Sequence, residues 1–242
     1  MPRNSQFVFK NTELAADLLT TPFRVHTNWH VITGAPSCGK TTLINLLADK
    51  GFQVAPEGAR LYLEREIARG RTIEEIRSNA AVAERGMKDM QLEIERGLQV
   101  NDRIFLDRAI PDYLAWYRFN GLDPNELLRE CFHYRYASVF ILDRLPLKQN
   151  GLRYKDDSLQ DFTEAWHTRD YRALGYSLTR VPVMPPEDRL AFVLGVLSEQ
   201  GLMQQQGEHS LHDFPVLAGV FDQAKDAINE AAAELRAAFE DL

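Results

Sequence analysis

Residues 34–41 read Gly34-Ala35-Pro36-Ser37-Cys38-Gly39-Lys40-Thr41 and match the pattern G-x-x-x-x-G-K-[ST]. In such a loop backbone N–H groups wrap a triphosphate, and glycines stand where a Cβ would block its close approach. The pattern predicts that Lys40 reaches the β- and γ-phosphates, that Thr41 ligates Mg²⁺, and that Thr42 supports the α-phosphate region. Residues 34–42 are therefore the predicted nucleotide-binding segment.

The residues on either side of this loop favour a strand before it and a helix after it. Trp29-His30-Val31-Ile32 is a short apolar run with β-branched residues, and Leu43, Leu46 and Leu47 recur at helical spacing. A helix that begins at the loop directs its partially positive N-terminus at the phosphates. The alternative, an ordinary glycine turn with an exposed lysine, does not account for these two flanking patterns.

The composition is that of a globular protein in a reducing compartment. The 242 residues are 45% hydrophobic and 26% charged. The net charge of −7 argues against a general nucleic-acid binder, and two cysteines are too few for a disulfide framework. The sequence has no apolar run of about 18 residues and no secretory signal at its N-terminus. We therefore expect a cytoplasmic protein without a membrane span.

Strand-like and helical segments alternate along the chain, which predicts βαβ units, a parallel sheet and the α/β class. Residues 58–98 are expected to be helical, with a break near Arg69–Thr72 and a Thr-x-x-Glu capping box from Thr72 to Glu75. A further helix is expected to end near Leu174. The expected strands after the first lie at residues 52–55, 103–108, 138–143 and 177–183.

We expect three parts in the chain. Residues 1–28 form an extension packed on the core, with a strand-like run at Phe7–Phe9 and a short helix near Thr12–Leu19. Residues 29–202 form the nucleotide-binding domain. Residues 203–242 form a linker and an amphipathic C-terminal helix, because apolar residues recur there in alternating steps of three and four. Docking of this helix on the domain is favoured, and pairing into a homodimer is the alternative.

Acidic residues fall at the ends of three expected strands, where parallel sheets bind their ligands: Glu57, Asp107 and Asp143. Asp107 is expected to hold Mg²⁺, and the alternative is that it caps the following helix. Either Glu57 or Asp107 is expected to accept the proton of an acceptor hydroxyl. Arg108 is expected to bind the charged group of an acceptor or the transferring phosphate.

A loop near residues 144–157 carries the cations Lys148, Arg153 and Lys155. Such a loop can close over the phosphates as a lid and neutralise charge that develops during transfer. On the helix that follows, Arg169 and Arg172 share one face, and Arg169 is expected to contact the nucleotide. The alternative is a solvated, charged loop without a catalytic role.

The chain resembles the small P-loop family of AAA-type ATPase domains and kinases, to which the nicotinamide riboside kinase domain is related. The resemblance covers roughly residues 28–200. It rests on Gly34–Thr42, Pro56-Glu57-Gly58-Ala59-Arg60, Phe105-Leu106-Asp107-Arg108, Phe140-Ile141-Leu142-Asp143, Asn150-Gly151-Leu152-Arg153-Tyr154, Leu174-Gly175-Tyr176 and Val181-Pro182-Val183.

The resemblance implies a kinase-like, three-layer P-loop NTPase fold with a parallel sheet of about five strands and a mobile lid. It implies ATP or GTP together with Mg²⁺. By this analogy Lys40 and Thr41 serve the phosphates and the metal, Asp107 is the acid on the strand beside the loop, and Arg153 is a lid arginine. The family often has Asp before the lid glycine, and this chain departs from the pattern with Asn150.

These observations predict an enzyme that transfers the γ-phosphoryl group of ATP to a small nucleoside- or nucleotide-like acceptor. Lys40 is expected to stabilise the transferring phosphate, while Arg108, Arg153 and Arg169 neutralise charge. The first alternative is a regulatory ATPase or GTPase switch that acts on a protein partner through the C-terminal helix. A second is a nucleotide-binding module without catalysis, which the set of Lys40, Thr41 and Asp107 disfavours.

Overall fold

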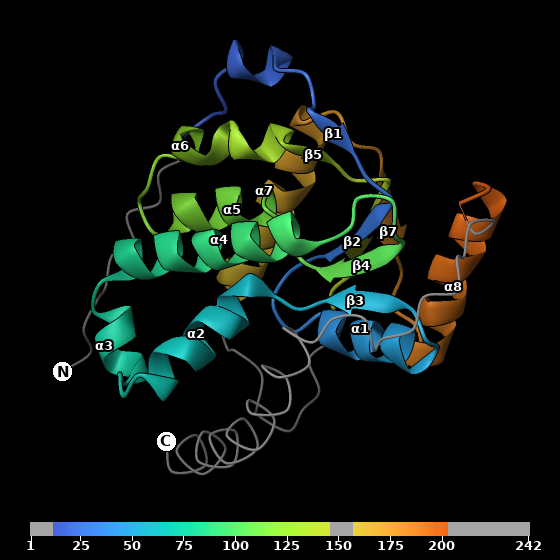
Figure 1. Cartoon of the computed structure of the whole chain (residues 1–242), viewed down its shortest axis with the longest axis horizontal. Helices are drawn as coiled ribbons and strands as arrows, with labels where there is room; N and C mark the ends of the chain where they lie inside the picture. The colour runs from blue at the N-terminus through green and yellow to red at the C-terminus, as the bar shows by residue number, and fades with distance from the viewer. Residues whose placement is uncertain (1–11, 146–156, 203–242) are drawn as a thin grey trace.

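Five parallel strands form the central sheet of the computed structural model, which describes residues 12–145 and 157–202 (Figure 1). Their order across the sheet is β3-β4-β2-β6-β7, so β2 lies at the centre. The strands are β2 (Trp29–Thr33), β3 (Gln53–Ala55), β4 (Ile104–Asp107), β6 (Ser138–Leu142) and β7 (Leu178–Val181). Every residue of β2 and of β4 is buried, as expected for parallel strands covered on both faces.

Helices cover the two faces of this sheet and complete a three-layer arrangement (Figure 1). On one face α1 (Lys40–Asp49) and α8 (Pro186–Glu199) enclose an apolar cluster with Ile32 and Phe105. On the other face lie α4 (Ala80–Gly97), α5 (Asp112–Phe119) and α7 (Asp157–Ala173). The apolar cluster on this second face contains Val31, Leu106 and Val139 from the sheet.

The remaining elements extend the second face. They are the 3₁₀ helix η1 (Leu18–Thr20), β1 (Val25–His26), α2 (Gly58–Ala68), α3 (Ile73–Arg77), α6 (Asn125–Leu128), the 3₁₀ helix η2 (Glu130–Phe132) and β5 (Tyr134–Arg135). Strands β1 and β5 pair in parallel as a separate two-stranded sheet. Leu14, Leu18 and Phe23 pack against the main apolar cluster. Among the described residues, no helix has both the length and the apolar character needed to cross a membrane.

The α/β class and the parallel sheet of five strands are confirmed. The Thr72–Glu75 capping box is also confirmed, because the Glu75 N–H donates to the Thr72 hydroxyl and the Thr72 N–H donates to the Glu75 carboxylate. The helix expected near Thr12–Leu19 is wrong, since the structure has only the short η1 there. Helix α8 and the β1–β5 pair were not expected. The strand-like run Phe7–Phe9 and the C-terminal helix lie outside the described residues.

One buried carboxyl group on α4 makes stability depend on pH. Glu84 is 6% exposed, its Oε2 accepts from Asn120 at 3.1 Å, and its Oε1 has no hydrogen-bond partner among the described residues. Burial raises the pKa of Glu84 from 4.5 to about 8, although the charge of Arg108 acts against this shift. Because the folded chain binds this proton more tightly than the unfolded chain, the stability contributed by Glu84 falls as pH rises from about 4.5 to about 8.

We expect the Glu84→Gln variant to lose less stability than the unaltered chain between pH 5 and pH 8. Glutamine keeps the size and the contact with Asn120 but cannot ionise, so up to about 4 kcal/mol of pH-dependent unfolding free energy should vanish. Urea unfolding at several pH values measures the difference between the two curves. Glu93→Gln, at an exposed position of the same helix, is the control. If the unfolding free energies of Glu84→Gln and the unaltered chain changed in parallel with pH, the raised pKa of Glu84 would be contradicted.

Candidate functional site

The loop between β2 and α1 has the backbone shape that a phosphate-binding loop needs. Gly34 and Gly39 have φ angles of 140° and 94°, and Ser37 lies in the left-handed region at 62°. A Cβ on Gly34 would approach the Leu142 carbonyl oxygen and the Cys38 Sγ to 2.9 Å each. Position 34 therefore requires glycine for two reasons, its backbone angle and the close approach of β6.

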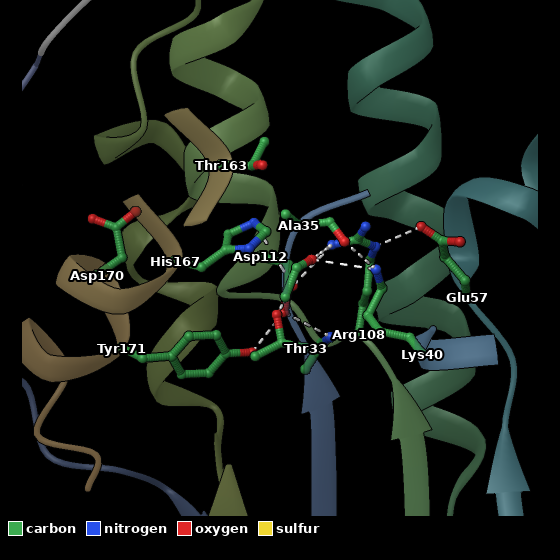
Figure 2. A network of polar contacts seen from close by, with 12 residues as sticks. Thr33, Ala35, Lys40, Glu57, Arg108, Asp112, Thr163, His167, Asp170 and Tyr171 are labelled. Carbon is green, nitrogen blue, oxygen red and sulfur yellow. Dashed lines mark hydrogen bonds and ion pairs between the residues drawn. The ribbon is translucent and has the colours of Figure 1, made fainter. Parts of the chain in front are cut away.

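Lys40 begins α1 and folds back over the loop. Its Nζ donates to the carbonyl oxygen of Ala35 at 2.9 Å (Figure 2). It also donates to the carbonyl oxygen of Gly34 at 3.3 Å. Burial lowers the pKa of Lys40 most, and the charge of Arg108 lowers it further, while Asp107 and Glu57 act in the opposite direction. The ammonium group thus lies in a poorly solvated place where an anionic phosphate would be a favourable partner.

Asp107 and Thr41 are brought together by the pairing of neighbouring strands. Asp107 ends β4 opposite Ile32 of β2, which places its carboxylate beside the start of α1. The Thr41 hydroxyl donates to Asp107 Oδ2 at 3.2 Å. Helix α5 begins at Asp112 with Pro111 in the capping position, so the alternative that Asp107 caps a helix is wrong.

One oxygen of Asp107 is left without a hydrogen-bond donor. Oδ1 is buried and has no partner among the described residues, and burial followed by the charge of Glu57 raises the pKa of this carboxyl group. A carboxylate and a threonine hydroxyl are hard oxygen donors, the kind that Mg²⁺ prefers beside phosphate. The pair formed by Asp107 and Thr41 therefore fits a magnesium ion.

Arg108 links the phosphate loop to Glu57. Its Nε donates to Glu57 Oε1 at 2.7 Å (Figure 2). Its Nη1 donates to the Gly34 carbonyl at 3.3 Å. The residue has a φ of 70°, which is unfavourable for a side chain with a Cβ, and its N–H donates to Ile32 at 3.1 Å. Such strain in a buried residue is characteristic of functional sites. Burial alone would lower the pKa of Arg108, but the carboxylates of Glu57 and Asp112 raise it overall.

Sequence reasoning missed Asp112, which is fully buried behind Arg108. Its Oδ1 accepts from Arg108 Nη1 at 3.2 Å and also from the Thr33 hydroxyl. Its Oδ2 accepts from the Tyr171 hydroxyl at 2.6 Å and from the Ala109 N–H at 3.2 Å. The separation of four residues from Arg108 was the only signal in the sequence, and the contacts with Thr33 and Tyr171 are too distant along the chain to read.

Sequence reasoning also missed Arg189 of α8, which supports the phosphate loop from behind. The side chain is 3% exposed and donates to three carbonyl oxygens. These belong to Cys38 at 2.6 Å, Asp143 at 3.0 Å and Pro182 at 3.0 Å. Arg189 therefore ties the loop to the ends of β6 and β7.

Of the other expected site residues, two are paired with side chains that the sequence did not reveal, and one lies outside the described residues. The Asp143 side chain accepts from Arg180 Nε at 2.9 Å, whereas Glu57 is held by Arg108 and Asp107 by Thr41. Arg169 is 58% exposed and pairs with Glu13, and these contacts give no support to a role in nucleotide binding. Arg153 and most of the expected lid lie outside the described residues.

A model of one protein family, described as AAA domain, matches residues 29–189. None of the curated proteins matches the chain. At 18% identity, the crystal structure of NadR protein in complex with NR has a TM-score of 0.51 over 76% of this chain and 53% of that one. NadR in complex with NAD and AMP-PNP gives 0.50 at 16% identity, over 76% and 52% of the two chains.

The chain spans about half the length of these NadR proteins. Thymidylate kinase from Candida albicans is also similar, with a TM-score of 0.46 and 12% identity over 75% of this chain and 96% of that one. At such identities the likeness to the NadR structures shows the P-loop NTPase fold, in agreement with the order of the strands.

Proposed function

This chain belongs to the AAA domain family, and we propose that it is a Mg²⁺-dependent kinase that transfers the γ-phosphoryl group of ATP to a small nucleoside- or nucleotide-like acceptor. Lys40 contacts the transferring phosphate, and Thr41 and Asp107 would hold Mg²⁺. The ion supplies neutralisation of phosphate charge when it is bound. Arg108 donates to the anionic groups that meet at the loop.

The observation that carries the proposal is the place of Glu57. This carboxylate follows β3, its side chain is 27% exposed, and one oxygen is held by Arg108 Nε at 2.7 Å. Its second oxygen accepts no hydrogen bond from the described residues, so it is available to an acceptor hydroxyl. The same arginine contacts Gly34 of the phosphate loop, which supports a proton acceptor beside the transferring group.

The test is a screen for acceptors with identification of the product. Purified protein is incubated with Mg²⁺ and either ATP or GTP, together with nucleosides, nucleotides or vitamin precursors. NR is included because a NadR structure of the same fold was solved with it. A phosphorylated product with matching ADP or GDP release is expected for one compound. Slow hydrolysis that no compound stimulates would contradict the kinase and favour a nucleotide-dependent switch.

The Glu57→Gln variant is expected to lower the turnover number for the acceptor about a hundredfold. Glutamine keeps the size of the side chain but cannot take the proton from the hydroxyl. The affinity for ATP should remain within about twofold, because Glu57 does not contact the nucleotide in this assignment. Steady-state kinetics and ATP titration measure the two effects. Glu64→Gln is the control, because Glu64 is a carboxylate on α2 that pairs with Arg60. Equal losses of turnover in both variants would contradict the assignment of Glu57 as the proton acceptor.

A further inference from the structure

We propose that Asp112 is a positioning residue that fixes the guanidinium group of Arg108 against Glu57 and the phosphate loop. Asp112 is fully buried, so it acts through Arg108 rather than on a substrate. The proposal rests on the function proposed above only in assigning catalytic work to Arg108. Whether Asp112 fixes the orientation of the Arg108 guanidinium group is measured by NMR, independently of catalysis.

Two of the three nitrogens in the guanidinium group of Arg108 donate hydrogen bonds to described residues, and the third does not. Nε is bound by Glu57 at 2.7 Å, and Nη1 lies 3.2 Å from Asp112 and 3.3 Å from the Gly34 carbonyl. Nη2 donates to none of the described residues. Asp112 and Glu57 thus hold two sides of a planar group, and the third is left to bind an anion such as a phosphate.

Asp112 is itself held at both carboxylate oxygens. Thr33 of β2 donates to Oδ1, and Tyr171 of α7 donates to Oδ2 at 2.6 Å. Burial alone would raise the pKa of Asp112, but the charge of His167 when its ring is protonated, then the charge of Arg108, and then these two hydrogen bonds lower it overall. The carboxylate therefore stays ionised and gives Arg108 a fixed, charged partner beneath the site.

Helix α7 joins this network from a distant part of the sequence (Figure 2). Besides Tyr171, it places His167 Nε2 3.8 Å from Asp112 Oδ1. Burial lowers the pKa of His167 to about 4, while the charge of Asp112 acts in the opposite direction, so the ring is neutral at neutral pH. The orientation of Arg108 thus depends on the position of α7 as well as on β2 and α5.

The test is a double-mutant cycle on MgATP turnover. Asp112→Asn keeps the shape and removes the charge, and we expect the turnover number to fall about thirtyfold with little change in KM for ATP. In the Arg108→Ala background the same substitution should cost less than about threefold, because Asp112 acts through Arg108. Equal losses in both backgrounds would overturn the proposal.

Asp170→Asn is the matched control. Asp170 is also a buried aspartate, it binds Arg118 at 2.6 Å, and it makes no contact with Arg108. Both substitutions remove the charge from a buried ion pair and should lower the melting temperature, but only Asp112→Asn should reduce turnover. If Asp112→Asn does not fold, Tyr171→Phe removes one hydrogen bond to Asp112, and a smaller loss of turnover is then expected. Full turnover in that variant would count against the proposal.

A second readout does not depend on catalysis. In ¹⁵N-labelled protein, the Nε–H signal of Arg108 should indicate slow rotation of the guanidinium group in the unaltered chain and in Asp170→Asn. In Asp112→Asn, rotation should become fast. An unchanged signal would overturn the proposal. If the unaltered chain turned over no nucleotide, the proposed function would fail, while this comparison would still decide whether Asp112 fixes Arg108.

Discussion

Replacing Lys40 with alanine is expected to reduce MgATP turnover at least about a thousandfold, because phosphoryl transfer depends on positioning and charge rather than on covalent chemistry. The ammonium group contacts the carbonyls of Gly34 and Ala35, so it already lies across the loop that would hold the phosphates. The rate of ADP release and the affinity for ATP measure the effect.

The fold should survive this substitution. Lys40 is a buried cation, and burial lowers its pKa. Its removal therefore eliminates a charge whose desolvation destabilises the folded chain. The thermal unfolding curve of Lys40→Ala is thus expected to match that of the unaltered chain or to lie at higher temperature. Lys50→Ala changes an exposed lysine at the other end of the same helix and should keep full turnover. Turnover by Lys40→Ala near the level of Lys50→Ala would refute the assignment of the loop.

The Asp107→Asn variant is expected to lose turnover by a factor of about 10² to 10³ and to require more Mg²⁺ for half of its remaining rate. Asparagine can still accept from the Thr41 hydroxyl but carries no charge for the metal. The unpartnered Oδ1 of Asp107 is the group whose loss should matter. Turnover measured over a Mg²⁺ series, with EDTA added to remove the metal completely, tests both statements.

The matched control for this variant is Asp143→Asn. Asp143 follows the end of β6 as Asp107 ends β4, yet its carboxylate pairs with Arg180. Its substitution should leave the Mg²⁺ dependence unchanged. A shift of the same size in both variants would mean that a general loss of negative charge, rather than ligation by Asp107, weakens the response to the metal.

Local patterns in the sequence were sufficient to predict the phosphate loop and its neighbours. The loop carries its own glycines, its lysine and the start of its helix, so Lys40 and Thr41 could be placed from adjacent residues. Asp107 could be placed as well, since the carboxyl ends of parallel strands meet at one edge of the sheet. The contact between Thr41 and Asp107 agrees with this expectation, because Asp107 ends β4, Thr41 follows the neighbouring strand β2, and the two residues meet at that edge.

The rest of the site depends on contacts that spacing does not reveal. Arg189 reaches the Cys38 carbonyl across 151 residues of chain, and Tyr171 reaches Asp112 across 59. The shared face of Arg169 and Arg172 was visible in the sequence, but the direction of that face was not, because it is set by how α7 packs on α5. Likewise, the sequence did not reveal that Asp143 pairs with Arg180 of the neighbouring strand.

The two cysteines lie in different layers of the fold. Cys38 belongs to the apolar cluster beneath α1 and α8, Cys131 belongs to the cluster on the opposite face of the sheet, and both are buried. A thiol reagent can therefore modify either one only when its own layer opens. The rate at which each thiol reacts would thus measure the local opening of its own layer. Both rates can be measured independently in one sample, one for the layer of α1 and α8 and one for the opposite layer.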